Sequence, residues 1–512
     1  MMAKQNRHAF LILGCMLTWA LRGQAQSALL IIPTPKSVRI AGQSLRLDAH
    51  SRLVIGKRAT ARERMAAFVV QSELRGTFGL SVPIVRQGRV QDGGTRVIFG
   101  VAGQKPKATF GAVLGGVNPP PRAEGYCVRV ARGAAIVAGH DPQGVLYGAQ
   151  TVCQMLRRDG QGVVLLPAQI DDYPSLAWRG AHLFVGNQAL PFHTRLIARI
   201  FARLKFNNLV LECEQAKWNA LGRAAPPWAM SKADLRREIQ FAHTYGLHVT
   251  PLINSVGHMG WLFADKVNLS MAEDPQMPYA ACVANPDTDR ALFQVYDEVL
   301  QTFRSSALHI GGDEATLRGR FPWRSRARYP TVADAYVAHV RRLHDYLQKK
   351  HVRTWLWADM LLAPGETQDF CNAPTVAQAH QMRANLPHDM VLFDWHYAAR
   401  GDFSSPRRLQ QAGFGPVIGA TWNNRANIAV FSKALAAQRQ RGLLQTTWAG
   451  YNSRAENLTH EAGQFSAFVV AAEEAWNGGK TNPARLPFDP ARVFRAWYGK
   501  QPHKRRGPDG TP

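Results

Sequence analysis

Two adjacent carboxylic acids, Asp313 and Glu314, follow two glycines in residues 309–314, which read His-Ile-Gly-Gly-Asp-Glu. A short apolar run before them, residues 306–308, is typical of a strand. Because glycines permit sharp turns and close backbone packing, both carboxyls would be presented together at the carboxyl end of that strand. In parallel α/β folds, ligands bind at that end. A solvated acidic turn is the alternative interpretation, since short motifs also arise by chance.

The elements that would position this pair alternate between strands and helices from Trp178 onward. Eight strands are expected, at 181–185, 209–212, 249–253, 307–310, 354–357, 391–395, 417–421 and 443–447. Helical patterns lie between them, including one with Leu196, Ile200 and Leu204 on a single apolar face. Eight such repeats predict an α/β fold, a (β/α)₈ TIM barrel over residues 176–500, with a carboxy-terminal helix after Asp489.

Several aromatic and polar side chains would meet at the mouth of that barrel. Sugar faces carry C–H groups that stack on aromatic rings, and sugar edges need polar partners. A ring of aromatics around paired carboxylates therefore predicts a sugar pocket, although each tryptophan taken alone is more often core than contact. The candidate binding residues are His258, Trp357, Trp395, Tyr397, Trp422 and Trp448, with Arg179 at the start of the first strand.

Residues 309–314 resemble the H-x-G-G-D-E signature of the β-N-acetylhexosaminidases, family 20 of the glycoside hydrolases. Further segments resemble the same family in order and spacing, so the resemblance spans roughly residue 30 to residue 500. These segments are residues 170–174 with 178–180, residues 251–258 and residues 355–360. The resemblance implies an exo-acting enzyme that removes terminal β-linked N-acetylglucosamine or N-acetylgalactosamine and needs no cofactor.

Neighbouring residues cannot easily take opposite sides of a sugar ring, as the two carboxyls of ordinary glycosidases do. Substrate assistance resolves this, because the 2-acetamido carbonyl of the sugar can attack the anomeric carbon with retention. The resemblance implies that Glu314 protonates the leaving oxygen and that Asp313 orients the acetamido nitrogen. It also implies that Arg179 holds the outer hydroxyls and that three tryptophans wall the acetamido pocket: Trp357, Trp422 and Trp448. Glu298 and His258 are secondary candidates.

The sequence also departs from the family pattern. Many members carry Trp-His-Leu-x-Asp-Asp after the second strand, whereas residues 211–217 read Leu-Glu-Cys-Glu-Gln-Ala-Lys. This stretch is closer to a bacterial branch of the family, but Gln215 stands where that branch has an acid. Residues 186–188, Gly-Asn-Gln, replace the Arg-His pair that usually follows the first strand. These departures bear on sugar specificity more than on the reaction.

The amino-terminal part of the chain has a different character. Residues 1–25 have the pattern of a secretory signal peptide: Lys4 and Arg7, a short apolar stretch, then a small-residue site ending at Ala25. This predicts a periplasmic or secreted protein; a lipoprotein anchored through Cys15 is the minor alternative. Residues 28–174 predict an α+β domain without chemistry of its own, similar to the non-catalytic domain of the same family, with one sheet covered by two helices.

The cysteine spacing suggests neither a disulfide scaffold nor a structural metal site, although one bridge is possible. The net charge of +26 favours either attraction to anionic polymers or an adaptation of solubility. Nucleic-acid-binding motifs are not recognised, and the basic tail at residues 501–512 is expected to be disordered.

The oligomeric state stays open. A secreted glycan-binding protein that has lost activity is the rival function, but a binder has no need of an acid such as Glu314.

Overall fold

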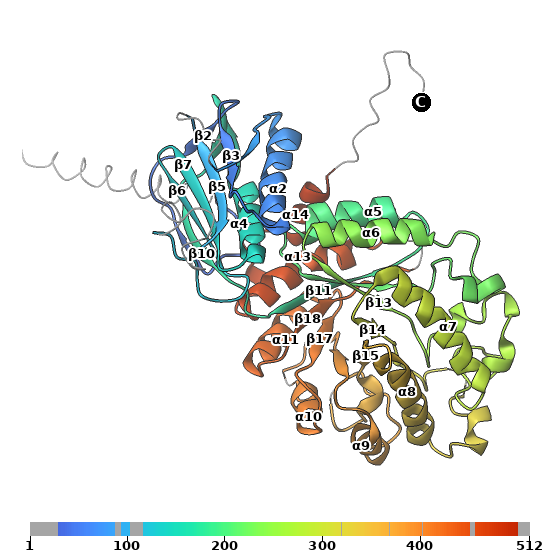
Figure 1. The fold of residues 1–512 in the computed structure, drawn as a ribbon. Helices are drawn as coiled ribbons and strands as arrows, with labels where there is room; N and C mark the ends of the chain where they lie inside the picture. The colour runs from blue at the N-terminus through green and yellow to red at the C-terminus, as the bar shows by residue number, and fades with distance from the viewer. Residues whose placement is uncertain are drawn as a thin grey trace, which may run out of the picture. The chain divides into compact units, whose positions relative to one another are not determined.

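The computed structural model describes residues 29–87, 94–102, 116–318, 320–367, 369–401, 403–450 and 456–499. It divides into two compact units at Pro174 and Ser175 (Figure 1). The predicted signal peptide, Cys15 and the basic tail lie outside the described residues. Among the helices that are described, none is long and apolar enough to cross a membrane.

The first unit is the predicted α+β domain. Its seven-stranded sheet has the order β1-β10-β6-β7-β5-β3-β4, and a second, three-stranded sheet, β2-β9-β8, was not predicted. Helices α2 and α4 pack against each other and against strands of the larger sheet. The bounds are β1 Ser37–Arg39, β2 Leu45–Leu47, β3 Arg52–Ile55, α2 Ala61–Phe78, β4 Ile84–Arg86, β5 Arg96–Val101, β6 Tyr126–Ala131, β7 Ala134–Gly139, α4 Pro142–Met155, β8 Leu156–Asp159, β9 Gly162–Leu165 and β10 Gln169–Asp172.

Local sequence explains where α2 begins and ends. The Thr60 hydroxyl accepts a hydrogen bond from the Glu63 amide at 3.2 Å, and the Glu63 carboxylate accepts one from the Thr60 amide at 2.7 Å. This reciprocal capping box satisfies amides that the first turn of a helix leaves without partners. Gly79 ends the helix in the left-handed conformation, with φ 70°.

The second unit is a closed barrel of eight parallel strands, β11 to β18, each paired with the next and β18 with β11. All eight strands predicted from sequence are present, which confirms the (β/α)₈ fold. The strands are β11 Trp178–Phe184, β12 Asn208–Glu212, β13 His248–Leu252, β14 Ala307–His309, β15 Arg353–Trp357, β16 Val391–Trp395, β17 Ile418–Thr421 and β18 Gly442–Gln445.

Helices surround these strands (Figure 1). They are α5 Ala189–Leu196, α6 Lys232–Thr244, α7 Pro286–Phe303, α8 Val332–Gln348, α9 Val376–Asn385, α10 Ser405–Gln411, α11 Arg425–Ala437, α12 Asn457–His460, α13 Ala462–Asn477 and α14 Pro490–Tyr498. Short helical turns are η1 Ile197–Phe201, η2 Asn219–Ala224, η3 Met259–Trp261, η4 Ala264–Lys266, η5 Leu269–Met271, η6 Arg324–Ala327, η7 Asp359–Leu361 and η8 Pro483–Arg485.

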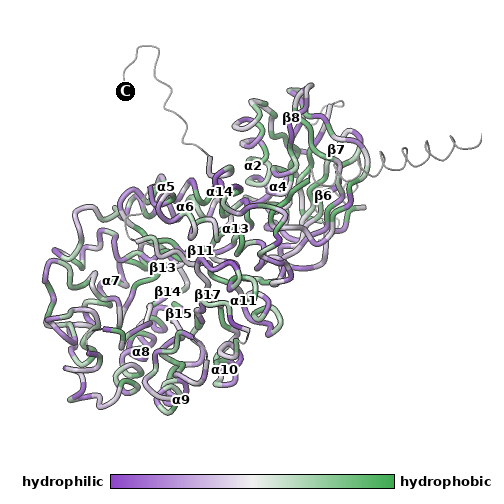
Figure 2. Tube along the Cα trace, turned by 180° about the vertical axis from the view of Figure 1, so that it is seen from behind, coloured by the Kyte–Doolittle hydropathy of each residue, from purple (hydrophilic) through white to green (hydrophobic). Residues whose placement is uncertain are grey.

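The helical face predicted from Leu196, Ile200 and Leu204 is buried, but α5 passes into a π-helical turn, η1, where an α-helix was expected. Hydrophobic and hydrophilic stretches alternate along the helices in Figure 2, as expected for helices that cover a barrel on one side. The barrel interior is filled by apolar and aromatic side chains from successive strands, among them Trp355, Phe393 and Leu444. A packed interior leaves the carboxyl ends of the strands as the place for a site.

Candidate active site

The turn that follows β14 presents Asp313 and Glu314 at the barrel mouth. Gly311 and Gly312 both have positive φ, 66° and 89°, and Glu314 follows at 48°. A Cβ atom at Gly311 would lie 2.1 Å from the Asn254 side-chain oxygen, and one at Gly312 would lie 2.5 Å from Leu356. Both positions therefore require glycine, for space as well as for backbone conformation.

The two carboxylates line a pocket of about 290 Å³ at the carboxyl ends of the strands. Its wall is largely aromatic, and the other lining residues are polar or charged. The lining residues are Phe184, Glu212, Asn254, His258, Asp313, Glu314, Trp357, Phe370, Trp395, Tyr397 and Trp448. The structure thus brings together seven of the predicted site residues.

His258 bridges the two acids. Its Nε2 atom lies 3.4 Å from Asp313 Oδ2 and 3.2 Å from Glu314 Oε2. Burial alone would lower the pKa of His258, but the two carboxylates outweigh burial and raise its pKa to about 11. The ring is therefore a cation at neutral pH. His258 itself has a left-handed backbone, with φ 57°, directly after the close turn at Gly257.

Asp313 keeps one oxygen available. Its Oδ2 atom faces His258, whereas its buried Oδ1 atom has no hydrogen-bond partner among the described residues. A buried carboxylate oxygen without a donor is costly, so the site is suited to a ligand that supplies an N–H or O–H there.

Glu314 is held through its backbone by a further acid. Its amide donates to Asp359 Oδ2 at 2.9 Å, and the Asn372 amide group donates to the same oxygen at 2.8 Å. Burial, and then the nearby charge of Asp313, raise the pKa of Asp359 to about 7. The Tyr279 hydroxyl lies 3.3 Å from the Glu314 carbonyl oxygen and 3.2 Å from His258 Nε2. These contacts fix the backbone of Glu314 and leave its carboxyl toward the pocket.

The aromatic wall is a connected set of rings. Trp448 donates its indole N–H to the Tyr397 hydroxyl at 3.0 Å, and its ring centre lies 6.4 Å from that of Trp357. Trp395 packs against both Phe370 and Tyr397, with ring-centre distances of 4.0 and 5.0 Å, and those two rings lie 5.1 Å from each other. Because the rings support one another, the wall is preorganised for a flat apolar face.

The predicted contact from Trp422 is wrong: Trp422 does not line the pocket. Its indole N–H donates to Gln464 Oε1 at 2.7 Å, and its ring packs 5.7 Å from Tyr397. The same Gln464 oxygen accepts the Trp448 amide at 2.6 Å. Trp422 therefore supports the wall from behind.

The prediction that Arg179 holds the outer hydroxyls of the sugar is also wrong. Arg179 is the second residue of β11, at the end of the barrel opposite the mouth, and it is only 1% exposed. Its guanidinium donates to the carbonyl oxygens of Lys205, Leu176 and Ala177 at 3.1, 2.9 and 3.1 Å and lies over the Trp476 ring. A buried residue at that face of a barrel serves stability.

The prediction that Glu298, the other secondary candidate, belongs to the site is wrong as well. It lies on α7 and accepts hydrogen bonds from the Asn219 and Ala220 amides and from Lys232. It ties a loop to a helix and does not line the pocket.

Sequence analysis missed the acidic floor of the pocket, which comes from β12. Glu212, itself buried, lies 3.1 Å from His182 Nε2, and the Asn254 side-chain amide donates to both Glu212 and Glu214 at 3.1 Å. Burial lowers the pKa of His182 to about 4, so this ring is neutral. Burial, and then the charge of Glu212, raise the pKa of Glu214. Glu212 at the end of β12 and Glu214 two residues later were the signal for this floor.

The cysteines and the possible metal ligands were also the subject of sequence predictions. Cys127, Cys153, Cys213, Cys282 and Cys371 are free thiols. Within the described part of the chain, no group of three or more His, Cys, Asp or Glu side chains is arranged to hold a metal ion. The pocket brings together a paired acid, a cationic histidine and an aromatic wall.

Comparison with known protein families agrees with this arrangement. Residues 166–478 match the catalytic domain of glycosyl hydrolase family 20, and residues 28–173 match domain 2 of the same family. The chain belongs to glycosyl hydrolase family 20. This confirms the resemblance inferred from residues 309–314.

Relatives within family 20 are distant. A β-hexosaminidase of Porphyromonas gingivalis is 23% identical over 505 residues, which cover 87% of this chain and 60% of the relative. A lacto-N-biosidase of Bifidobacterium bifidum is 24% identical over 324 residues, which cover 60% of this chain and 27% of the relative. The chain thus spans less than two thirds of the length of each of these relatives.

Solved structures share the fold. A β-N-acetylhexosaminidase of Bacteroides fragilis superposes with a TM-score of 0.62 at 18% identity, over 87% of this chain and 91% of that one. A family 20 exo β-N-acetylglucosaminidase of Vibrio harveyi gives a TM-score of 0.67 at 16% identity, over 88% and 74% of the two chains.

Proposed function

We propose that this protein is an exo-acting β-N-acetylhexosaminidase that removes terminal β-linked N-acetylglucosamine or N-acetylgalactosamine with retention. The observation that carries the proposal is the Asp313-Glu314 pair, with the unpartnered Asp313 Oδ1 atom beside a pocket wall of aromatic rings. Family membership and the names of the relatives support the same substrate class.

The geometry suits a nucleophile that belongs to the substrate. The two acids are adjacent in the chain and share His258, so they cannot flank a sugar ring from opposite faces. The acetamido carbonyl attacks the anomeric carbon, and the bond to the leaving oxygen breaks as Glu314 donates its proton. Asp313 Oδ1 accepts the acetamido N–H and stabilises the positive charge that develops on the ring formed by this attack. Water then opens that ring, with Glu314 taking the proton back.

The pocket supports an exo mode of action. About 290 Å³ suits a single pyranose, and the rings of Trp357, Trp395 and Trp448 can take its apolar face and its acetamido methyl group. On the floor, Glu212 and Asn254 are placed to bind sugar hydroxyls, which is the task that sequence analysis had given to Arg179.

The test is release of a chromophore from aryl β-N-acetylglucosaminide and galactosaminide. Glu314→Gln should lower kcat by about 10²–10⁴-fold, because general acid assistance is of that size. Asp313→Asn should also slow turnover, and a thiazoline mimic of the bicyclic intermediate should inhibit tightly. Glu298→Gln is the matched control, since Glu298 lies outside the pocket, and it should retain activity.

Three results would contradict the proposal. Sugar binding without any turnover would favour the glycan-binding alternative. A covalent sugar trapped on a carboxylate of the protein would exclude substrate assistance, as would efficient hydrolysis of the matching glucoside, which has no acetamide.

We also propose that the protein is exported and that residues 1–25 are removed, on the pattern around Ala25. Mass spectrometry of the mature amino terminus tests this. An intact Met1 would contradict export, and a lipid on Cys15 would make the protein an anchored lipoprotein.

A further inference from the structure

The proton donor stands on a strained stretch of backbone. Glu314 has a left-handed conformation, with φ 48°, although it is not a glycine. Such a conformation is costly for a residue with a side chain, so it persists only where the surrounding contacts hold it. Two contacts hold the peptide groups of Glu314: its amide donates to Asp359 Oδ2 at 2.9 Å, and its carbonyl oxygen lies 3.3 Å from the Tyr279 hydroxyl. The contact with Asp359 is the shorter of the two.

Asp359 serves a second donor through the same oxygen. It lies at the start of the turn η7, directly beyond β15, and is only 1% exposed. Its Oδ2 atom accepts the Glu314 amide and also the side-chain amide of Asn372, at 2.8 Å. Its backbone carbonyl accepts the backbone amide of Asn372, also at 2.8 Å. One buried acid therefore joins the proton donor to Asn372.

This second partner of Asp359 belongs to the pocket wall. Residues 369–372, which we call the wall segment, contribute Phe370 to the lining of the pocket. The Phe370 ring packs against Trp395, with 4.0 Å between the ring centres. Asn372 ends the wall segment, so its bond to Asp359 ties one end of the segment to the support of the proton donor.

A buried cation anchors the other end of the wall segment. His396 Nδ1 lies 2.5 Å from Oδ1 of Asp369, the first residue of the segment. Burial alone would lower the pKa of His396, but Asp394 and Asp369 raise it to about 10, so the ring carries a proton at neutral pH. With His396 at one end and Asp359 at the other, the wall segment is a fixed support.

Proton donation is sensitive to such support. A general acid must lie within hydrogen-bond reach of the leaving oxygen, about 2.6–3.2 Å. A displacement of about 1 Å, caused by a change away from the reacting atoms, can cost about 10²-fold in rate. The sugar lies against the wall that includes Phe370, whereas its leaving oxygen faces Glu314. The distance between wall and donor therefore decides how well the proton is delivered.

We propose that Asp359 is a positioning residue of the reaction, which places the Glu314 carboxyl beside the leaving oxygen by holding the Glu314 amide against the wall segment. Asp359 does not line the pocket, so it acts through Glu314 and not on the sugar. This rests on the proposed function, because only a glycosidase uses Glu314 as a proton donor.

The experiment compares two aryl β-N-acetylglucosaminides whose leaving groups differ in their need for a proton. Phenolate is a poor leaving group and needs the proton, whereas 2,4-dinitrophenolate needs little help. In Asp359→Ala, kcat/KM for the phenyl glycoside should fall about tenfold more than kcat/KM for the dinitrophenyl glycoside. A loss of folded protein lowers both values equally, so the ratio isolates proton donation. The later step, in which water opens the ring, does not enter kcat/KM.

Two further variants separate the hydrogen bonds from the fold. Asp359→Asn keeps an oxygen that can accept the Glu314 amide, so the ratio of the two kcat/KM values should return to within about threefold of wild type. Asn372→Ala removes only the side-chain link to the wall segment. It should change the ratio in the same direction as Asp359→Ala, by about threefold.

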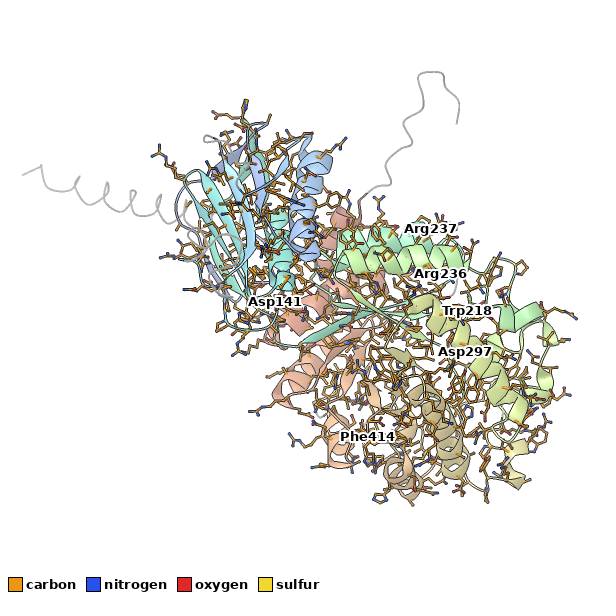
Figure 3. All side chains as sticks on the ribbon, viewed as in Figure 1. Asp141, Trp218, Arg236, Arg237, Asp297 and Phe414 are labelled. Atoms are coloured by element: carbon orange, nitrogen blue, oxygen red, sulfur yellow. The ribbon has the colours of Figure 1, made fainter. Side chains whose placement is uncertain are left out.

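Asp297, labelled in Figure 3, provides the matched control. It lies on α7 and does not line the pocket. Like Asp359, it uses one oxygen for two donors: Oδ1 accepts the Tyr346 hydroxyl at 2.7 Å and pairs with the Lys350 ammonium at 2.9 Å. Asp297→Ala should change neither kcat/KM.

The positioning role would be overturned by equal losses on the two glycosides in Asp359→Ala, or by no loss. It would also be overturned if Asp359→Asn shifted the ratio as far as Asp359→Ala. Failure of the proposed function gives a different result, since the wild-type protein would then hydrolyse neither glycoside, and the positioning role would fall with it. An active wild type with equal losses in Asp359→Ala removes the positioning role alone.

Discussion

At the scale of single residues, His258 carries the strongest electrostatic signature in the site. Asp313 and Glu314 would repel each other in a partly buried pocket if both were ionised without compensation. The imidazolium of His258, whose Nε2 atom lies within 3.4 Å of both carboxylates, offsets that repulsion. The pair can therefore stay in place while the pocket is empty, which is a form of preorganisation.

A pH dependence of stability follows from this cation. The pKa of His258 in the fold is about 11, well above its usual value of about 6.5, so the folded state retains a proton that the unfolded state loses. The contribution to the free energy of unfolding is complete below pH of about 6.5 and declines as pH rises toward 11. His258→Gln should remove that decline, so the difference in melting temperature between wild type and variant should shrink as the pH rises from about 6 to about 10.

The control for this measurement is His248→Gln. His248 is exposed at the first position of β13, away from the acid pair. Groups that titrate in all three proteins cancel when the melting temperatures are subtracted. If the difference in melting temperature between wild type and His258→Gln stays constant with pH, the assignment of a bridging cation is contradicted.

At the scale of secondary-structure elements, the strand and helix pattern was predicted well because each strand is a short apolar run between amphipathic helices. The paired acids were found because they follow a glycine pair at a strand end. The direction of a side chain was harder to predict. Trp355 and Trp357 lie on one strand and both belong to the barrel core, yet only Trp357 also lines the pocket, because only the end of β15 reaches the barrel mouth.

Two element-level features escaped prediction for physical reasons. The π-helical turn η1 changes hydrogen bonding without changing the apolar face, so the hydrophobic pattern of residues 196–204 does not reveal it. The partners of Glu212 are His182 on β11 and Asn254 after β13, which are brought together only by the barrel. Single-sequence patterns carry no information about such contacts between strands.

Arg179 provides a test at this scale, since a structural role and a sugar-binding role predict different outcomes. Arg179→Lys should lower the free energy of unfolding by about 2–4 kcal/mol, because a lysine cannot reproduce three hydrogen bonds to carbonyl groups and the contact with Trp476. The KM of the folded variant should be unchanged. Denaturant titration and steady-state kinetics measure the two quantities.

Arg199→Lys is the companion variant, because Arg199 is exposed on the neighbouring turn η1 and should tolerate the exchange in both measurements. A raised KM in Arg179→Lys, with stability preserved, would restore Arg179 as a sugar ligand and contradict its placement at the far end of β11.

At the scale of the whole molecule, the net charge of +26 is the feature that the pocket does not explain. The substrate proposed for the pocket is uncharged, and the acid pair with its floor makes the pocket itself acidic. A basic exterior around an acidic site would separate two tasks: recognition of the sugar, and attraction of the whole protein to the material that carries it. We propose that anionic polymers are that material.

The proposal predicts a steep dependence on salt. Binding to dextran sulfate beads should be strong at about 20 mM salt and largely lost near 300 mM, since added ions screen the attraction and remove the entropy gained by counterion release. Uncharged dextran beads are the control and should bind little at either concentration. Hydrolysis of the small aryl substrate should change far less over the same range, because its leaving group and sugar carry no charge. Binding to dextran sulfate that stays flat with salt would contradict the proposal and leave the basic surface as an adaptation of solubility.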